Sequence, residues 1–141
     1  MKRKASAEWQ GDLKTGKGTV STESGVLQGT PYSFTTRFEN AKGTNPEELV
    51  AAAHAGCFTM ALSAELGKAN LVPQRLRTTA TVSLDKGDAG WSVTESHLEV
   101  SAKIPGASPE AFRKAAETAE KGCPISKLFN TKITMDAKLE P

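Results

Sequence analysis

The chain has 141 residues, of which 38% are hydrophobic, and a formal net charge of +2 at pH 7. This length suits a single domain, residues 1–141, with a hydrophobic core of its own. The small charge does not favour nucleic acid as a partner. No apolar run follows the basic start, and no stretch approaches the ~20 apolar residues of a membrane span. We therefore expect a cytoplasmic protein with no signal peptide and no membrane partner.

The first third of the chain predicts strands. Short β-favouring segments are expected at residues 7–9, 18–22 and 25–27, before a turn at 29–31. Residues 32–38 alternate between apolar and polar side chains, with the aromatic rings on one face. We predict a strand there, from which Arg37 projects on the face opposite the rings.

A helix is predicted from Pro46 to Ala69. Asn45 suits the N-cap, Pro46 suits the first helical position, and Glu48 would complete a capping box. Asn70 is the expected stop. The many alanines and glycines of this segment indicate that another backbone comes close to it. Two neighbouring stripes are expected along it, made of Leu49, Ala53, Gly56, Met60 and Ala64, and of Val50, His54, Cys57 and Ala61.

The remainder alternates strands and helices. Two long strands are expected at residues 76–84 and 91–104, and the flip of apolar parity between Val93 and Leu98 predicts a bulge. The last elements are predicted as helices at 108–121 and 124–129 and a strand at 133–139. This order predicts the α+β class.

Two cysteines, Cys57 and Cys123, suggest a redox cycle. In a reducing cytoplasm a permanent disulfide between them is not expected. We interpret Cys57 as a buried thiol on a rigid helix, too far from the helix start for the dipole to ionise it. It needs a cation, and Arg37 is the best candidate. Cys123 precedes Pro124 and suits an N-cap, where a thiolate is favoured, as a resolving thiol requires.

A carboxylate would orient the guanidinium of Arg37, and both Glu47 and Glu48 are candidates. The ten residues from Glu47 to Cys57, at a rise of about 1.5 Å each, separate them by roughly 15 Å, so they cannot share a site along one straight helix. If two copies of the helix crossed antiparallel near Ala52, each Glu47 would approach Cys57 of the partner subunit. We hypothesise a composite site in a homodimer.

Six segments of the chain together resemble the OsmC branch of the OsmC/Ohr family of thiol-dependent hydroperoxide reductases. They read WQGD, KGTVSTESG, KGTNPEEL, AAHAGCF, SLDK and GCPIS, at residues 9–12, 17–25, 42–49, 52–58, 83–86 and 122–126. The resemblance implies that Cys57 is the peroxidatic cysteine, that Cys123 is the resolving cysteine, and that Arg37 and Glu47 are the active-site arginine and glutamate.

The same resemblance implies a fold and a reaction. The fold is an intertwined homodimer, with an antiparallel sheet wrapped around central helices. The reaction is the reduction of organic hydroperoxides, and of hydrogen peroxide, through a sulfenic acid and an intramolecular disulfide. A dithiol, such as a lipoylated protein, would be the reductant. No cofactor and no metal are implied.

Other interpretations stay open. Both thiols could be inert parts of a purely structural domain, or the chain could be an OsmC-like redox sensor or binding protein that does not turn over. His54 shares a helix face with Cys57, but the chain lacks the paired ligand spacing of a zinc site. A packed core histidine is preferred over a group that tunes Cys57. Phe58 and Phe129 are candidates to line an apolar mouth for an alkyl tail, worth ~0.8 kcal/mol per buried CH₂.

Overall fold

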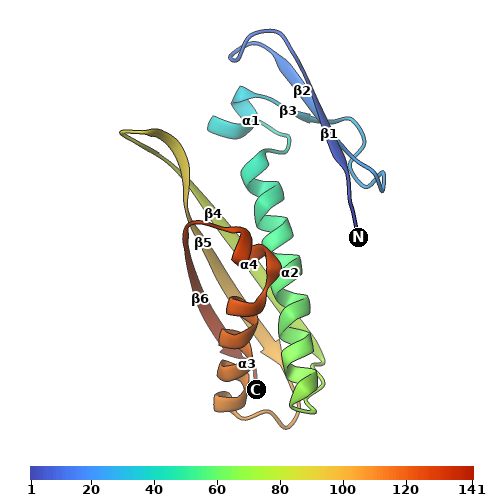
Figure 1. Cartoon of the computed structure of the whole chain (residues 1–141), viewed down its shortest axis with the longest axis vertical. Coiled ribbons are helices and arrows are strands. Elements are labelled where there is room, and N and C mark those ends of the chain that lie inside the picture. Colours follow the sequence, from blue (N-terminus) through green and yellow to red (C-terminus); the bar gives the residue numbers. More distant parts are fainter. The chain divides into compact units, whose positions relative to one another are not determined.

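The computed structural model describes all 141 residues (Figure 1). The chain divides into two compact units, Met1–Leu49 and Val50–Pro141, which are described in turn. The expectation of a single domain stays a prediction. Each unit contains one three-stranded sheet. Helix α1 lies in the first unit, α3 and α4 lie in the second, and α2 begins in the first unit and continues into the second. The chain therefore has the α+β composition that the sequence predicts.

The first unit is built on an antiparallel sheet with the order β1-β2-β3, formed by Ala5–Gln10, Lys17–Thr22 and Thr30–Tyr32. Gly18 of β2 pairs with Trp9 on one side and Tyr32 on the other. The two rings lie 5.5 Å apart across it. A Cβ at Gly18 would stand 2.5 Å from the Tyr32 ring, so only glycine lets the two aromatic residues meet over this strand.

The strand predicted at residues 32–38 is wrong. β3 ends at Tyr32, and Phe34–Phe38 form a short helix, α1. The cause is local: the Ser33 hydroxyl accepts from the Thr36 amide at 3.2 Å, and the Thr36 hydroxyl accepts from the Ser33 amide at 2.8 Å. This reciprocal capping box starts a helix where the alternation of side chains favoured a strand. Arg37 therefore projects from a helix.

Two smaller predictions in the first unit are also wrong. Residues 25–27 belong to the connection between β2 and β3, and residues 30 and 31 lie in β3 although the turn was expected at 29–31. Gly25, the first residue of the expected strand, and Gly29, in the expected turn, both have positive φ, of 76° and 60°, and shape the loop instead.

Helix α2, Pro46–Lys68, starts and stops where the sequence predicts. The Glu48 amide donates to Asn45 Oδ1 at 2.8 Å, which confirms the N-cap. The Glu48 carboxylate does not close the expected box, because it accepts from the Thr44 hydroxyl at 2.8 Å. At the other end Asn70 has a φ of 56°, and the Leu71 amide bonds the Leu66 carbonyl at 3.0 Å. This is the left-handed ending for which asparagine is suited.

The same helix corrects another expectation. Its 23 residues contain a window of mean hydropathy 1.4, so by length and composition it could cross a membrane. A core helix of a soluble protein has the same properties, and length and composition alone do not separate the two. The residues it buries in this chain are His54, Phe58, Leu62 and Leu66, spaced four apart. Of the two predicted stripes, the second lies nearer the core, since His54 is buried and Cys57 and Ala61 pack against the core, whereas Met60 of the first is 77% exposed.

The second unit contains the sheet β4-β5-β6, formed by Arg75–Gly87, Gly90–Lys103 and Lys132–Leu139. β4 and β5 are antiparallel. Ser83 pairs with Glu95 and Leu84 with Val93, so Thr94 is the extra residue of a bulge, as predicted. β6 runs parallel to β5, which corrects the expectation of a wholly antiparallel sheet. The crossover that a parallel pair needs is made by α3, Pro109–Gly122, and α4, Pro124–Leu128.

Helices α2 and α3 cover one face of this sheet (Figure 1). The buried side chains of this core come from α2, β5 and α3 and from the residues just after β5 and α3: Phe58, Leu62, Leu66, Leu98, Val100, Ala102, Ile104, Phe112, Ala115, Ala116, Ala119 and Cys123. Burying a leucine or phenylalanine fully contributes about 1.5–3 kcal/mol. Cys123 is therefore part of the hydrophobic core, which fixes the position of its sulfur.

Candidate active site

The two cysteine sulfurs lie 3.0 Å apart, and both thiols are free. Cys57 comes from the middle of α2, and Cys123 from the junction of α3 and α4. A disulfide bond is about 2.05 Å long, so oxidation requires the sulfurs to approach by only about 1 Å. The packing of the second unit has already brought together two residues that are 66 positions apart.

The exposure of the two thiols is the reverse of the expectation. Cys123 is fully buried, and Cys57 is half-buried. The reason is the phase of α2, whose inward side chains include His54 and Phe58, so that Cys57 lies at the edge of the packed face. Of the two sulfurs, that of Cys57 is the one a small molecule from solvent can reach.

Cys123 is held by backbone bonds on both sides. It ends α3, where its amide donates to the Ala119 carbonyl at 2.8 Å, and it is the N-cap of α4, as predicted, where its carbonyl accepts from the Lys127 amide at 3.0 Å. Pro124 occupies the first position of α4, where its missing N–H costs nothing. The junction between the two helices therefore fixes the Cys123 backbone.

The two thiols ionise as a pair. Burial, and then the hydrogen bond to Cys123, raise the pKa of Cys57 above its ordinary value, against a smaller opposite effect of the Ile125 amide. Burial also acts to raise the pKa of Cys123, but the hydrogen bond to Cys57 and the Ser126 amide and hydroxyl outweigh it, and the net pKa is lowered. Within the second unit the negative charge therefore settles first on Cys123, the thiol for which the N-cap position predicted a favoured thiolate, and Cys57 still needs a cation.

The candidate arginine and glutamate meet in the first unit. Arg37 Nη2 lies 2.7 Å from Glu47 Oε1, and Arg37 Nε lies 3.2 Å from both carboxylate oxygens. The Asn45 side-chain amide donates to the Thr36 carbonyl at 3.1 Å and so ties α1 to the start of α2. This answers the question that the sequence left open: Glu47 is the partner of Arg37, and Glu48 bonds Thr44.

His54 is a packed core histidine, as the preferred interpretation had it. Its ring is fully buried; Nδ1 lies 2.7 Å from Ser96 Oγ and Nε2 lies 2.9 Å from Ser126 Oγ. The Phe129 ring meets it edge-on at 4.9 Å. Burial lowers the pKa of His54, so the ring is neutral near pH 7. Sequence reasoning missed both serines, because nothing in the pattern of a strand or a short helix marks a serine as a histidine partner.

The structure also bears on two ideas from the sequence, a zinc site at His54 and an apolar mouth lined by Phe58 and Phe129. No group of three or more His, Cys, Asp or Glu side chains gathers as a metal site would require, and both nitrogens of His54 already face hydroxyls. Phe58 is fully buried in the core, so it does not line an apolar mouth. Phe129 is half-buried and packs on His54.

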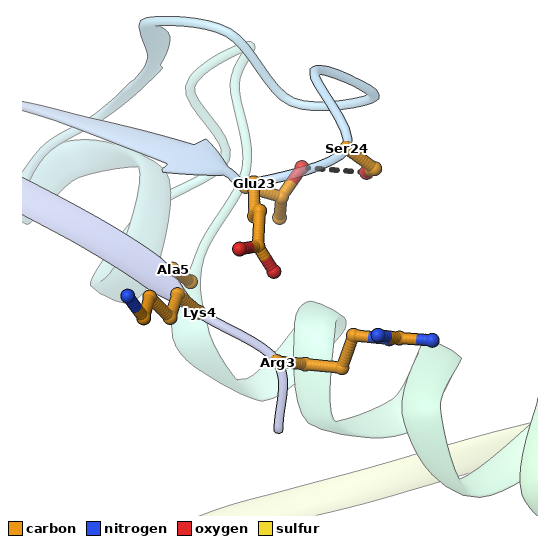
Figure 2. Close-up of a pocket in the computed structure, with 6 residues that line it drawn as sticks. Arg3, Lys4, Ala5, Glu23 and Ser24 are labelled. Atoms are coloured by element: carbon orange, nitrogen blue, oxygen red, sulfur yellow. Dashed lines mark hydrogen bonds between the residues drawn. The ribbon is translucent and has the colours of Figure 1, made fainter. Parts of the chain in front are cut away.

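A shallow pocket in the first unit is lined by Arg3, Lys4, Ala5, Thr22, Glu23 and Ser24. Figure 2 shows the Arg3 and Lys4 side chains extending in opposite directions, with the Glu23 carboxylate between them. The basic groups do not converge on one point, and the dashed line joins the hydroxyls of Thr22 and Ser24, 3.2 Å apart. This pocket contains neither cysteine and is not the candidate site.

The sequence of this chain is similar to those of known proteins over most of its length. The model of the family described as OsmC-like protein matches residues 39–138. Peroxiredoxin OsmC of Escherichia coli K12 is 52% identical over 138 residues, which cover 98% of this chain and 96% of that protein. Organic hydroperoxide resistance protein OhrB of Bacillus subtilis is 29% identical over 124 residues, covering 87% of this chain and 88% of that protein.

Solved structures agree on the fold. An OsmC-like protein of unknown function from Vibrio cholerae superposes with a TM-score of 0.77 at 17% identity, covering 98% of this chain and 99% of the other. The crystal structure of OhrB of Bacillus subtilis gives a TM-score of 0.69 at 22% identity, covering 97% and 98% of the two chains. The family model, the sequence relatives and the shared fold lead to one conclusion: this chain belongs to the OsmC-like protein family.

Proposed function

We propose that this protein is a thiol-dependent peroxidase that reduces organic hydroperoxides, and also hydrogen peroxide, through Cys57 and Cys123. The observation that carries the proposal is the 3.0 Å distance between the two free sulfurs, one reachable from solvent and one buried. A relative at 52% identity is named a peroxiredoxin, and more distant ones are named organic hydroperoxide resistance proteins.

The chemistry takes two steps. The Cys57 thiolate attacks the outer oxygen of ROOH; an S–O bond forms, the O–O bond breaks, and RO⁻ takes a proton and leaves as an alcohol, which leaves a sulfenic acid on Cys57. The Cys123 thiolate then attacks that sulfur; the S–S bond forms, the S–O bond breaks, and hydroxide leaves as water after protonation. A dithiol, such as a lipoylated protein, returns both thiols by exchange. The reducing cytoplasm is the proposed compartment.

The half-buried Cys57 is the peroxidatic residue because the peroxide must reach the sulfur it oxidises. Its raised pKa is then an obstacle, since only the thiolate attacks. The Cys57 thiolate can form by moving its proton across the 3.0 Å S···S contact to Cys123, but this transfer runs against the opposite pKa shifts of the two thiols. A cation beside Cys57 would shift the charge toward that sulfur.

Arg37, oriented by Glu47, is the cation that we propose for this role. The bidentate pair fixes the plane of the guanidinium and still leaves N–H groups to donate, which suits a peroxide oxygen that gains charge as the O–O bond breaks. We propose that it acts on the partner's Cys57 in a homodimer.

The homodimer has support from one face of α2. Ala52, Ala53, Gly56 and Met60 are exposed there, and a Cβ at Gly56 would meet no atom within 4 Å. A strip of small side chains around one exposed methionine can accept a second helix at close range. The composite site is tested by mixing Glu47→Gln chains with Cys57→Ser chains: neither parent is active, and mixed dimers recover activity. If none returns, the cross-chain assignment is wrong.

The function itself is tested by thiol titration after one equivalent of cumene hydroperoxide. We expect a Cys57–Cys123 disulfide in the parent, a trapped sulfenic acid or overoxidation in Cys123→Ser, and no reaction in Cys57→Ser. With dithiothreitol present, the parent should consume many equivalents of hydroperoxide. Oxidation that stops after one equivalent would support the sensor, and thiols that resist oxidation would support the purely structural domain.

A further inference from the structure

A buried cluster of three polar side chains is formed by residues close in sequence to both cysteines, and the two-step chemistry does not use it. His54, on α2, lies between Ser96, on β5, and Ser126, on α4. His54 and Ser96 are fully buried and Ser126 is 7% exposed. A buried polar group costs free energy unless it is hydrogen-bonded, so three such groups in an otherwise apolar core call for a reason.

Ser126 connects this cluster to the resolving cysteine. Cys123 is the N-cap of α4, where its side chain accepts no capping hydrogen bond, and Ser126 is the third residue after it. The Ser126 amide and hydroxyl are among the groups that lower the pKa of Cys123, so both lie within reach of its sulfur. The cluster therefore meets the cysteine pair through a helix of only five residues, Pro124–Leu128.

Such a short helix depends on its tertiary contacts for stability. Ile125 of α4 packs against the hydrophobic core. The polar support of α4 comes from His54: the Ser126 hydroxyl lies 2.9 Å from His54 Nε2, and Phe129, just after the helix, packs against the same ring at 4.9 Å. His54 lies one helical turn before Cys57 on α2. His54 thus links the segment that carries one sulfur to the helix that carries the other.

We propose that His54 is a positioning residue for the resolving step: through Ser126 it holds α4 in place and aims the Ser126 hydroxyl proton at the sulfur of Cys123. The proposal rests on the proposed function and concerns its second step, in which the Cys123 thiolate attacks the sulfenic acid. His54 does not touch the substrate, and the first step does not need it.

The arrangement fixes one tautomer of the ring. Ser126 has a single hydroxyl proton, and if that proton faces Cys123, the proton in the 2.9 Å contact must come from His54 Nε2. Nδ1 then carries no proton and accepts from the Ser96 hydroxyl at 2.7 Å. The direction of donation runs from Ser96 to His54, to Ser126 and to Cys123. A histidine with only a packing role has no requirement for this tautomer.

The first test needs no variant. Nitrogen-15 NMR of the reduced, wild-type protein, labelled at histidine, distinguishes the two neutral tautomers of His54. We expect the proton on Nε2. A proton on Nδ1 would overturn the proposal, because the Ser126 hydroxyl would then have to donate to the ring and could not face Cys123.

The second test separates the two chemical steps by rapid quench with cumene hydroperoxide, with dimedone to trap sulfenic acid. In Ser126→Ala we expect sulfenic acid to form within about twofold of the parent rate, and the disulfide to close about tenfold more slowly, the effect of one hydrogen bond. Ser101→Ala, on β5 outside the cluster, is the matched control and should match the parent in both steps. Equal closure rates in Ser126→Ala and the parent would overturn the proposal.

Substitution of the ring gives a graded version of the test. His54→Gln keeps an N–H donor near the position of Nε2 and should restore part of the closure rate that His54→Leu loses. If the two variants closed equally slowly at matched unfolding temperatures, the role of the ring would be packing alone, against the proposal. A failure of the proposed function is distinct, because a parent that consumes no hydroperoxide would fail before any variant is compared.

Discussion

The arginine–glutamate pair of the first unit and the cysteine pair of the second unit are assembled in different ways. Arg37 and Glu47 are ten residues apart, and the local bonds of Ser33, Thr36 and Asn45 hold the two helix starts that carry them. Cys57 and Cys123 are 66 residues apart and meet only because a hydrophobic core forms between α2, α3 and the sheet. The first pair is thus set by capping chemistry and the second by packing.

The difference shows in the environment of each pair. The Arg37 side chain is 37% exposed, so its ion pair with Glu47 contributes little to stability and is available to a ligand. Cys123 is fully buried, and the ionisation of both thiols is displaced from its ordinary range. Perturbed groups of this kind mark a site where reactivity has been shaped by the fold.

The largest expected effect comes from the cysteine pair. Cys57→Ser should abolish hydroperoxide reduction, because serine does not form the nucleophile at neutral pH. Cys123→Ser should retain the first step and lose repeated turnover. Both are measured as hydroperoxide consumed per chain with dithiothreitol as reductant. Sustained turnover in Cys57→Ser would show that Cys57 is not the peroxidatic cysteine.

The arginine pair should give the next largest effect. Arg37→Lys keeps the charge but loses the fork that binds Glu47 bidentately, and we expect kcat/KM for cumene hydroperoxide to fall roughly 10–100-fold. Arg75 forms a comparable exposed pair with Glu140 and provides the control. An equal loss in Arg75→Lys would show that the effect is a general one on the fold.

Two residues of α2 that are two positions apart, Met60 and Leu62, differ in burial and should differ in the effect of substitution. Leu62 is fully buried, so Leu62→Ala should lower the free energy of unfolding by about 2–5 kcal/mol. Met60 is 77% exposed in a single chain, and Met60→Glu should leave monomer packing intact but disrupt the proposed dimer face. Urea unfolding and analytical ultracentrifugation measure the two outcomes. A Met60→Glu protein that stays dimeric would place the interface elsewhere.

The smallest expected effect is a shift in ionisation. Burial raises the pKa of Cys57, and the hydrogen bond to Cys123 raises it further. Cys123→Ala removes the second cause, so the pKa of Cys57 should fall and its alkylation by iodoacetamide should reach half its maximal rate at lower pH than in the parent. Cys123→Ser places a neutral hydroxyl there that can donate to the Cys57 thiolate, so it should also lower the pKa of Cys57. A midpoint that moves to higher pH would mean that Cys123 had been stabilising the Cys57 thiolate.

Helix caps, helix ends and bulges were predicted correctly where the local sequence favoured a single backbone structure. Asn45 at the start of α2, Asn70 at its end and the bulge at Thr94 all lie where the sequence places them. The predictions failed where two local preferences competed. The alternation of residues 32–38 favoured a strand, but Ser33 and Thr36 cap each other and start a helix.

Which side of α2 is buried was also beyond the sequence. Alanine and glycine are compatible with several faces of this helix, so its hydrophobic pattern has weak direction, and the helix is apolar enough overall to resemble a membrane span. The large residues decide the phase only once a sheet is present to receive them. That phase makes Cys57 half-buried and His54 fully buried.

The sequence by itself determined the order of most elements and the residues that can supply a thiol, a guanidinium or a carboxylate, because capping, turn and redox chemistry are properties of residue types. Only the tertiary structure decided which thiol is buried, which glutamate binds Arg37, and that two serines bracket His54. Those facts depend on distances between residues remote in the chain, and a sequence pattern contains no distances until a core has formed.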